Sequence, residues 1–461
     1  MEEKRYGVGV MASYGMGKFL AEFLTGAYGA IVYKYYETTV SLGGLYVALA
    51  TILYSLWNAV NDPLIGYATN LAAPFSKKLG RRFAWIVIGL ILCALLFVAI
   101  FAVPESMRLK AGTSPIPIFI WMVLAICLFD GSYSLWEVNY QSVYPDKFRS
   151  QTERTRAAAI STAVGVLGVA AGFVVPPLFF EYDKPESFLT MALVVGAITL
   201  VGILLLVFGI KESPSMIERF QAKQKSDKQQ LSFFSSMRHA LRYKELVSFV
   251  VLLFLYQSGC MCMTGSVHYV GDYVLQVSAD GTTMIFAGML GGALVSIPLW
   301  TILSKKLKNN QMTLIVSLTV MAVFAFAMTF VETMGAYTVL MALWGIGFGG
   351  FWTFMGPAMA DVVDMIVVTE KRRQEGIYMG IRAFFMRFSI ASQALVFFIV
   401  HEATGFDPGN ITPLAKFGVK LHMATIPAVF FLIGALYFWK TNTLTPQRIA
   451  EHRAELARLD I

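Results

Sequence analysis

The chain has 461 residues, of which 57% are hydrophobic and 14% are charged, and its mean hydropathy is +0.62. About a quarter of the residues of a soluble globular protein are charged, so this composition excludes a soluble fold. The net charge of +8 is not gathered on a soluble domain, which excludes a typical nucleic-acid-binding protein.

Long apolar runs recur along the whole chain, and each reaches or exceeds the roughly 20 residues that a helix needs to cross the hydrocarbon core. The runs are continuous rather than alternating, which favours helices over barrel strands. The expected spans are 6–36, 43–69, 83–103, 115–144, 156–180, 186–211, 245–273, 280–304, 312–332, 334–368, 375–402 and 414–440. The sequence therefore predicts an all-α polytopic membrane protein with twelve transmembrane helices.

The hydrophilic segment 212–244 divides these spans six and six. It predicts two six-helix bundles, 1–211 and 245–440, joined by a cytoplasmic linker and followed by a cytoplasmic tail at 441–461. The run "FSKKLGRR" after the second span has an echo in "LSKKLKNN" after the eighth. This echo favours duplicated halves of the kind that rock about a central site in transporters.

The distribution of basic residues predicts the orientation of the chain. Most of the 37 lysines and arginines lie in the N-terminus, in the loops after even-numbered spans and in the C-terminal tail. Cytoplasmic loops are enriched in Lys and Arg, so we expect both termini in the cytoplasm and a multi-pass protein of the cell membrane, plasma or inner.

Placing an ionisable side chain inside a membrane span costs at least about 2.5 kcal/mol of insertion free energy. We therefore expect each such residue to have a structural or functional role. Lys18 and Glu22 are four residues apart, as are Asn58 and Asp62, which places each pair on one helix face. Polar and aromatic residues of the fourth and eleventh spans complete this set: Asp130, Trp136, Glu137, Asn139, Arg382 and Arg387. Together these residues predict a polar cavity with aromatic walls, which suits a polyhydroxylated or anionic organic solute.

Two groups of these charges also admit a purely structural explanation. Lys18 and Glu22 could form a simple ion pair near the end of a helix. A second group is predicted to form salt bridges that gate the inner face: Arg81, Arg82, Asp361, Asp364, Arg372, Arg373 and Glu375.

Three motifs resemble those of one transporter family. They are "NDPLIG" followed by "KKLGRR", then "ADVVD" at 360–364 followed by "EGIYMGIRAFFMR", and "GK…EF…YYET" in the first span. In these motifs the chain resembles the glycoside–pentoside–hexuronide:cation symporters, the melibiose-permease-like branch of the major facilitator superfamily. The resemblance implies alternating access and uptake of a sugar-like solute coupled to Na⁺, Li⁺ or H⁺.

The resemblance also implies roles for individual residues. Lys18 and Glu22 match a lysine and a sugar-binding aspartate, and Trp352 matches a sugar-contacting tryptophan. Arg382 matches a polar position facing the substrate, and Arg387 matches a lysine near the cation site. The expected substrate site therefore contains Lys18, Glu22, Trp136, Glu137, Asn139, Trp352 and Arg382.

The cation site departs from the pattern of that family. Asp62 matches the second of two aspartates, but Asn58 stands in place of the first, and the spacing from Asp130 to Trp136 also differs. A single carboxylate compensates poorly for the lost hydration of Na⁺, whereas a lone buried carboxylate can take up a proton because desolvation disfavours its charge. We therefore expect coupling to H⁺ through Asp62, with Asn58, Asp130 and Arg387 beside it, and Na⁺ at Asp62 as the alternative.

The sequence thus predicts a cation-coupled symporter of a sugar, glycoside or hexuronide. Transport of a lysolipid or other anionic amphiphile, or uncoupled facilitation, remain alternatives. The sequence contains no P-loop and no cluster of catalytic residues, so we do not expect an enzyme. The four cysteines have no His or acidic neighbours at metal-ligand spacing. We therefore expect no cofactor besides the coupling cation. The expected partners are the solute, the cation and the bilayer, and the expected oligomeric state is a monomer.

Overall fold

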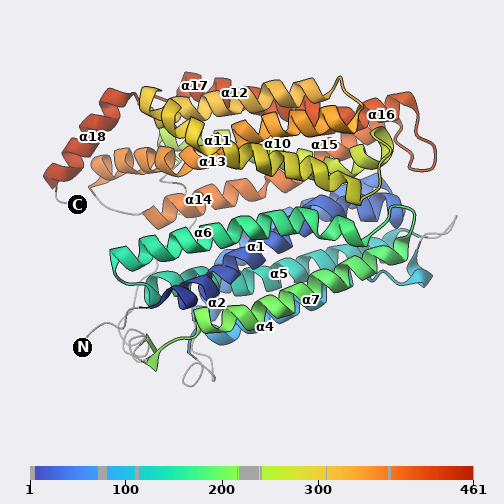
Figure 1. Cartoon of the computed structure of the whole chain (residues 1–461), viewed down its shortest axis with the longest axis horizontal. Coiled ribbons are helices and arrows are strands. Elements are labelled where there is room, and N and C mark those ends of the chain that lie inside the picture. The colour runs from blue at the N-terminus through green and yellow to red at the C-terminus, as the bar shows by residue number, and fades with distance from the viewer. Residues whose placement is uncertain are drawn as a thin grey trace. The chain divides into compact units, whose positions relative to one another are not determined.

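The computed structural model describes residues 6–70, 80–108, 114–214, 216–217, 238, 241–307, 309–371 and 375–459 (Figure 1). The chain divides into two compact units. The N-terminal unit contains residues 1–229 and 278–283, and the C-terminal unit contains residues 230–277 and 284–461. The predicted linker 212–244 falls mostly outside the described residues.

The N-terminal unit is built from long helices joined by short ones. The α-helices are α1 (Val8–Lys34), α2 (Gly44–Asn70), α4 (Phe83–Phe101), α5 (Ile116–Lys147), α6 (Gln151–Val174) and α7 (Pro185–Ile210). The short helices are η1 (Tyr35–Thr39), η2 (Glu105–Met107) and η3 (Pro176–Phe179). α1 packs on α6 and α7, while α5 packs on both α2 and α4.

The C-terminal unit has the same character. Its long helices are α10 (Lys244–Tyr269), α11 (Thr283–Leu307), α12 (Asn310–Met328), α13 (Met334–Glu370), α14 (Glu375–Arg387), α15 (Ser389–Thr404) and α17 (Ile426–Thr441). Shorter elements are η4 (Val270–Val274), α16 (Pro413–Lys420), η6 (Leu421–Thr425) and the tail helix α18 (Pro446–Leu459). The short helix η5 (Asp280–Thr282) comes before α11 in sequence but belongs to the N-terminal unit. α12 packs on α13 and α17, and α10 packs on α15 and α17.

Small residues let the helices approach closely. At Gly172 of α6 an added Cβ would lie 2.8 Å from the carbonyl oxygen of Phe23, and at Gly168 it would overlap the carbonyl oxygen of Phe19. Backbone contact of this kind replaces the hydrophobic driving force that is missing between helices in lipid. It fixes the packing of α6 on α1.

The two units share an unusual local structure. α1 ends in the π-helix η1, and α10 ends in the π-helix η4. After each π-helix one residue takes a left-handed conformation, Ser41 at φ 62° and Gln276 at φ 53°. Both elements also carry one acidic residue at their third position, Glu37 and Asp272. This match in register supports the duplication that the sequence echo indicated.

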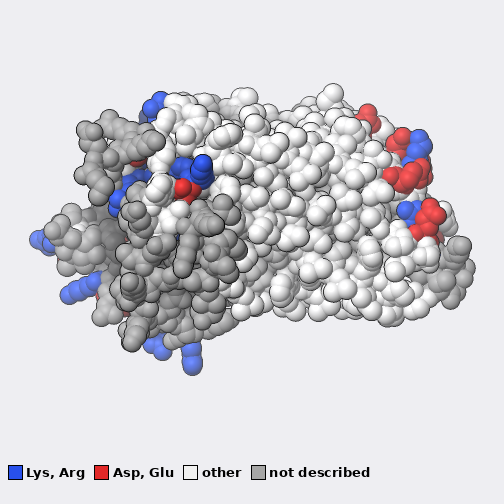
Figure 2. Space-filling view, turned by 90° about the horizontal axis from the view of Figure 1, so that it is seen from below, with Lys and Arg blue, Asp and Glu red and all other residues white. Residues whose placement is uncertain are grey.

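The predicted all-α membrane fold is confirmed, whereas the number of twelve spans stays a prediction. Ten stretches of the described chain are long and apolar enough to cross a membrane, and they coincide with the third to twelfth predicted spans. α1 and α2 have 27 residues each but carry the polar residues discussed below. Figure 2 shows charged side chains towards the helix ends on the face it presents, with uncharged residues between them.

The eleventh predicted span differs from the structure in its continuity. α14 and α15 are separated at Phe388, whose N–H donates to the carbonyl of Phe385 at 3.3 Å instead of continuing the α-helical pattern. Arg387 therefore lies at the break. Interrupted helices line cavities or buried sites in membrane proteins, because their free backbone groups need partners.

Candidate functional site

A buried carboxylate is the centre of a polar cluster in the N-terminal unit. Asp130 of α5 is 3% exposed, and its two oxygens accept hydrogen bonds from α2. Oδ1 accepts from Asn58 Nδ2 at 2.7 Å and from the Tyr54 hydroxyl at 3.4 Å, while Oδ2 accepts from Asn61 Nδ2. These bonds replace the water that the carboxylate loses on burial.

The cluster extends through further polar atoms. Ser134 Oγ donates to Asn61 Oδ1 at 3.1 Å, and Asn58 Nδ2 also lies 3.1 Å from the Tyr54 hydroxyl. Asn58 Oδ1 is buried and accepts no hydrogen bond from the described residues. The ring of Tyr28 covers the cluster, 5.5 Å from the Tyr54 ring. We call Tyr54, Asn58, Asn61, Asp130 and Ser134 the Asp130 cluster.

Helix geometry explains why α2 supplies three members of this cluster. Tyr54, Asn58 and Asn61 are spaced by four and three residues, so they lie on one face of α2, opposite α5. Asp62 is the next residue and is half-buried. The structure thus brings the predicted Asn58 and Asp130 together. Asn61 and Tyr54, which were not predicted, also donate hydrogen bonds to Asp130.

Lys18 and Glu22 form an ion pair on α1, with 2.6 Å between Lys18 Nζ and Glu22 Oε1. Their side chains are 49% and 32% exposed on the surface of the N-terminal unit. The stem of Lys18 lies against α6, where a Cβ added to Gly165 would be 2.6 Å from Lys18 Cγ. The pair is therefore a solvated, partly packed polar feature of this unit.

The predicted residues of α5 lie in different surroundings. Trp136 is fully buried, and its ring contacts Tyr133 and Tyr140 at 5.3 and 5.9 Å between centroids. Asn139 is also buried and donates to the carbonyl of Leu135 at 2.8 Å. Glu137 is half-buried and accepts a hydrogen bond from Gln141. Of these residues, Glu137 is the most accessible to a solute.

In the C-terminal unit, a cation and an indole ring lie on adjacent helices. Trp352 of α13 is 47% exposed and contacts the ring of Phe348 at 6.3 Å. Arg382 of α14 is half-buried, and its Nη1 lies 3.9 Å from the sulfur of Met355, which follows Trp352 by three residues on α13. Arg387 ends α14 and is half-buried.

Two acidic residues, Glu212 and Asp146, contact the basic residues just before α4, and neither was predicted from the sequence. Glu212 accepts backbone hydrogen bonds from Arg81, Arg82 and Phe83 at 3.0, 2.6 and 3.1 Å. Arg82 Nε lies 3.8 Å from Asp146 of α5. Burial and the neighbouring Arg81 lower the pKa of Arg82 to about 10, so Arg82 keeps its charge at neutral pH.

The other predicted inner-face residues are only partly described. Asp361 is 2% exposed, and its Oδ2 accepts from Asn310 Nδ2 at 3.2 Å. Asp364 is half-buried. Arg372 and Arg373 lie outside the described residues, as does the side chain of Glu375. The gating role of this group stays a prediction.

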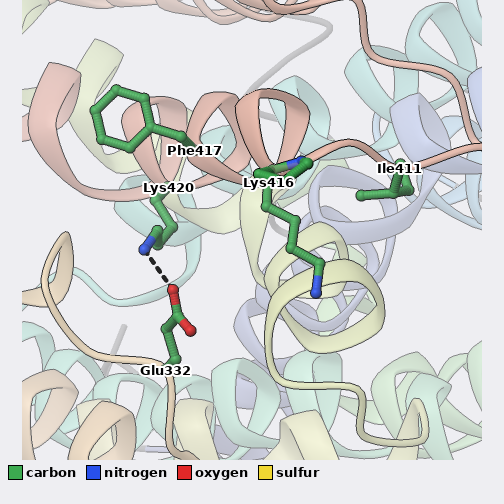
Figure 3. Close-up of a pocket in the computed structure, with 6 residues that line it drawn as sticks. Glu332, Ile411, Lys416, Phe417 and Lys420 are labelled. Atoms are coloured by element: carbon green, nitrogen blue, oxygen red, sulfur yellow. Dashed lines mark hydrogen bonds and ion pairs between the residues drawn. The ribbon is translucent and has the colours of Figure 1, made fainter.

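An open pocket lies in the C-terminal unit, apart from all of these residues (Figure 3). Glu332 forms an ion pair of 2.7 Å with Lys420, and the lining is completed by Ile411, Pro413, Lys416 and Phe417. The hydrogen bond from Lys420 lowers the pKa of the Glu332 carboxyl, which stays ionised at neutral pH. The pocket is shallow and charged, and no predicted site residue lines it.

Apolar helices with a buried carboxylate and charged residues in their midst are typical of ion and substrate pathways in membrane proteins. Residues 13–443 match the model of the MFS/sugar transport protein family, and the chain belongs to this family. The predicted resemblance to the sugar symporters of the major facilitator superfamily is thereby confirmed.

Curated relatives agree with this family. The chain is 21% identical over 420 residues to sodium-dependent lysophosphatidylcholine symporter 1 of Mus musculus, covering 83% of this chain and 76% of the relative. It is 22% identical over 433 residues to the raffinose carrier protein of Pediococcus pentosaceus, covering 89% and 65%. A solved bacterial homolog of the human lysosomal transporter Spinster, inward-facing and unoccupied, shares the fold with a TM-score of 0.67 at 12% identity, covering 96% and 97%.

Proposed function

We propose that this transporter is a cation-coupled symporter and that the Asp130 cluster binds the coupling cation. The observation that carries the proposal is the burial of Asp130 among three donors from α2. A carboxylate at this depth is costly, and in membrane proteins such groups mark ion pathways by default.

The hydrogen bonds of Asp130 bear on which cation is coupled. Amide N–H groups donate to both oxygens, which leaves both of them acting as acceptors. Asn58 Oδ1, the Tyr54 hydroxyl and the Asp130 carboxylate are all oxygen ligands, which hard cations prefer. Rotation of the Asn58 amide would exchange its donor for its oxygen at the same place. We therefore favour Na⁺ at Asp130 over the H⁺ coupling through Asp62 that the sequence analysis expected.

We propose a sugar or glycoside as the solute. The family description and the raffinose carrier support this class. In the N-terminal unit, Lys18 and Glu22 are partly exposed and supply hydrogen-bonding groups. In the C-terminal unit, the exposed ring of Trp352 supplies an aromatic face and the half-buried Arg382 supplies donors, which suits a sugar ring. A lysophospholipid is the second candidate, because the lysophosphatidylcholine symporter is equally similar to this chain.

We also propose that the protein lies in the cell membrane as a monomer with both termini in the cytoplasm. The asymmetry of basic residues supports this orientation.

A binding experiment in detergent or nanodiscs tests the coupling site. NaCl is titrated at constant ionic strength against choline chloride, and the unfolding midpoint is followed for the wild type, Asp130→Asn and Asp62→Asn. We expect Na⁺ to raise the midpoint of the wild type and of Asp62→Asn, since a ligand at 100 times its Kd adds about 2.7 kcal/mol. Asp130→Asn should lose the effect. Loss in Asp62→Asn alone would instead support Na⁺ at Asp62, and a response to pH but not to Na⁺ would support H⁺ coupling through Asp62.

The solute is tested separately in proteoliposomes. Raffinose, a glucuronide and lysophosphatidylcholine are compared in counterflow with Na⁺ on both sides. Exchange of raffinose or the glucuronide supports the sugar proposal, and exchange of lysophosphatidylcholine alone overturns it.

A further inference from the structure

The pocket of Figure 3 lies along α16, and this short helix has three faces of different character. One face packs on the rest of the C-terminal unit, and its residues are small or apolar: Ala415, Gly418 and Val419. The second face is apolar but exposed, with Leu414 at 57% and Phe417 at 44%. The third face is basic, because Lys416 and Lys420 are four residues apart. Helices with an exposed apolar side and a basic side are typical of the headgroup region of membranes.

The direction of the basic face is fixed at both ends of the helix. The Thr412 hydroxyl accepts the N–H of Ala415 at 3.1 Å, and Pro413 lies in the first turn, where its missing N–H costs nothing. Near the other end, a Cβ added to Gly418 would overlap the side chain of Thr404 of α15. Rotation of α16 would bring a larger side chain against Thr404, so the two lysines stay on the side where Glu332 lies in Figure 3.

The position of α16 along its span places the two lysines at the membrane boundary. α16, η6 and α17 together form one candidate span, Pro413–Thr441. Between Lys420 and Lys440 this span carries no Lys, Arg, Asp or Glu. A helix over 421–439 is about 28 Å long, and the hydrocarbon core is about 30 Å thick, so these two lysines mark its two surfaces. Lys416 lies one turn beyond Lys420, at the level of the lipid phosphates.

The pocket holds one surplus positive charge. Lys420 Nζ lies 2.7 Å from Glu332 Oε1, and the Lys420 side chain is 13% exposed. The hydrogen bond from Lys420, with the charges of Lys420 and Lys416, lowers the pKa of Glu332, which is therefore ionised at neutral pH. Lys416 lines the pocket but forms no ion pair with any residue that the structure describes. The described lining thus contains two cations and one anion.

Other acidic residues near α16 do not line this pocket. Asp272 is half-buried on η4, which packs on α16. Glu402 and Asp407 belong to the end of α15 and the segment after it, and both are exposed. Among the described residues, Glu332 is the acidic residue of the lining. A ligand in the pocket therefore meets a net positive charge beside an exposed apolar surface.

We propose that the pocket binds the phosphate group of a membrane phospholipid. The ammonium group of Lys416 donates charge-assisted hydrogen bonds to the phosphate oxygens. Lys420 adds to the positive field while it holds Glu332. The glycerol group and the first part of the acyl chains lie against the exposed ring of Phe417, which follows Lys416 towards the hydrocarbon core. This inference is independent of the proposed function, because neither the coupling cation nor the solute takes part in it.

The apolar residues beside the lysines favour a lipid over a free anion. A single lysine at the surface holds a free anion weakly, because both charges are solvated and are screened by salt. A phospholipid is already concentrated at this level of the bilayer, and its apolar part covers side chains that water would otherwise contact. Leu414 and Phe417 supply that apolar surface on the same helix.

Native mass spectrometry of the full-length protein in detergent tests the proposal. Phosphatidylglycerol is titrated against the wild type and against Lys416→Gln, which removes the charge and keeps most of the side chain. We expect the apparent dissociation constant of one bound phosphatidylglycerol to rise about fivefold, the usual contribution of one lysine at a lipid surface. Equal binding by the two proteins would overturn the proposal.

A second variant is expected to act in the opposite direction. Glu332→Gln releases Lys420 from its ion pair and should tighten the binding of phosphatidylglycerol several-fold. Unchanged or weaker binding would contradict a site in this pocket. Lys184→Gln is the matched control, because Lys184 forms an ion pair with the exposed Glu181 in the N-terminal unit, and it should leave binding unchanged. If Lys416→Gln fails to fold, the direction of the Glu332→Gln effect decides the question.

Two further ligands separate the phosphate from the acyl chains. Diacylglycerol has the same chains but no phosphate, so the wild type and Lys416→Gln should bind it equally. Weaker binding of diacylglycerol by the variant would assign the effect to altered packing of α16. Inorganic phosphate at millimolar concentration should not displace phosphatidylglycerol from the wild type. Displacement would assign the pocket to free anions and rule out the lipid.

Discussion

At the residue scale, the Asp130 cluster shows how far the sequence leads to the site. The analysis selected Asn58, Asp62 and Asp130 because charges and amides stand out in apolar spans. It missed Asn61 and Tyr54, although Asn61 follows Asn58 by three residues on the same helix face. Which of the neighbours Asn61 and Asp62 turns towards α5 depends on the rotation of α2, and helix rotation is set by packing that one sequence does not show.

Ser134 gives a prediction at this scale. Its hydroxyl donates to Asn61 Oδ1 and so holds the amide whose N–H₂ faces Asp130. We expect Ser134→Ala to lower the free energy of unfolding by about 1 kcal/mol, since one buried hydrogen bond is lost. We also expect it to weaken Na⁺ binding several-fold. Chemical denaturation and Na⁺ titration measure the two effects.

Ser132 is the control for this prediction. It is buried on the same helix, but its hydroxyl takes no part in the cluster. Ser132→Ala should leave Na⁺ affinity unchanged, and an equal loss in both variants would assign the effect to general packing of α5.

At the element scale, helix positions follow from apolar length, whereas helix contacts depend on small residues. The predicted spans agree with most helices to within a few residues, because a run of this length has one stable form in lipid. The break at Phe388 was not predicted, because the segment "AFFMRFSIAS" contains neither of the residues that usually mark a helix break, Gly and Pro. The π-helix η1 contains neither Gly nor Pro and was not predicted either.

Gly168 tests the packing of α6 on α1. A side chain there overlaps the carbonyl of Phe19, so we expect Gly168→Val to lower stability by about 1–3 kcal/mol, the usual cost of overpacking. The unfolding midpoint and the yield of monodisperse protein measure this loss. Gly29→Val on α1, where an added Cβ has no neighbour within 4 Å, is the matched control.

Glu212 tests how the start of α4 is stabilised. Its carboxylate accepts the N–H groups of Arg81, Arg82 and Phe83, which are otherwise free at a helix N-terminus. Glu212→Gln keeps the shape but removes the charge and one acceptor, and we expect a loss of about 1 kcal/mol. The thermal unfolding midpoint checks this, and an unchanged midpoint would show that water replaces the cap without cost.

At the scale of the whole molecule, composition predicted a polytopic helical membrane protein and the motifs predicted a transporter, and the family match confirms the transporter. The identity of the solute could not be predicted, because sugar carriers and a lysophospholipid symporter share this fold and about the same identity to the chain. A few side chains on common helices decide that difference.

Orientation is the prediction at this scale. With both termini in the cytoplasm, the loop containing Asp183 faces outwards and the loop containing Arg149 faces inwards. A membrane-impermeant maleimide should label Asp183→Cys in intact cells and Arg149→Cys only after permeabilisation. The native Cys93, Cys260 and Cys262 are buried and Cys127 is half-buried, so labelling of the parent protein without either substitution gives the background. The opposite pattern would reverse the predicted topology.

The matched π-helices η1 and η4 bear on the evolutionary origin of the two halves of the chain. A π-turn arises when one residue is inserted into an α-helix, and the helix beyond it is rotated relative to the part before it. Both halves carry this insertion at the end of their first helix, with an acidic residue at the same position in each. If one ancestral half gave rise to both, the insertion is older than the duplication and belonged to a protein with half as many helices. Each half would then have kept the extra residue since the duplication.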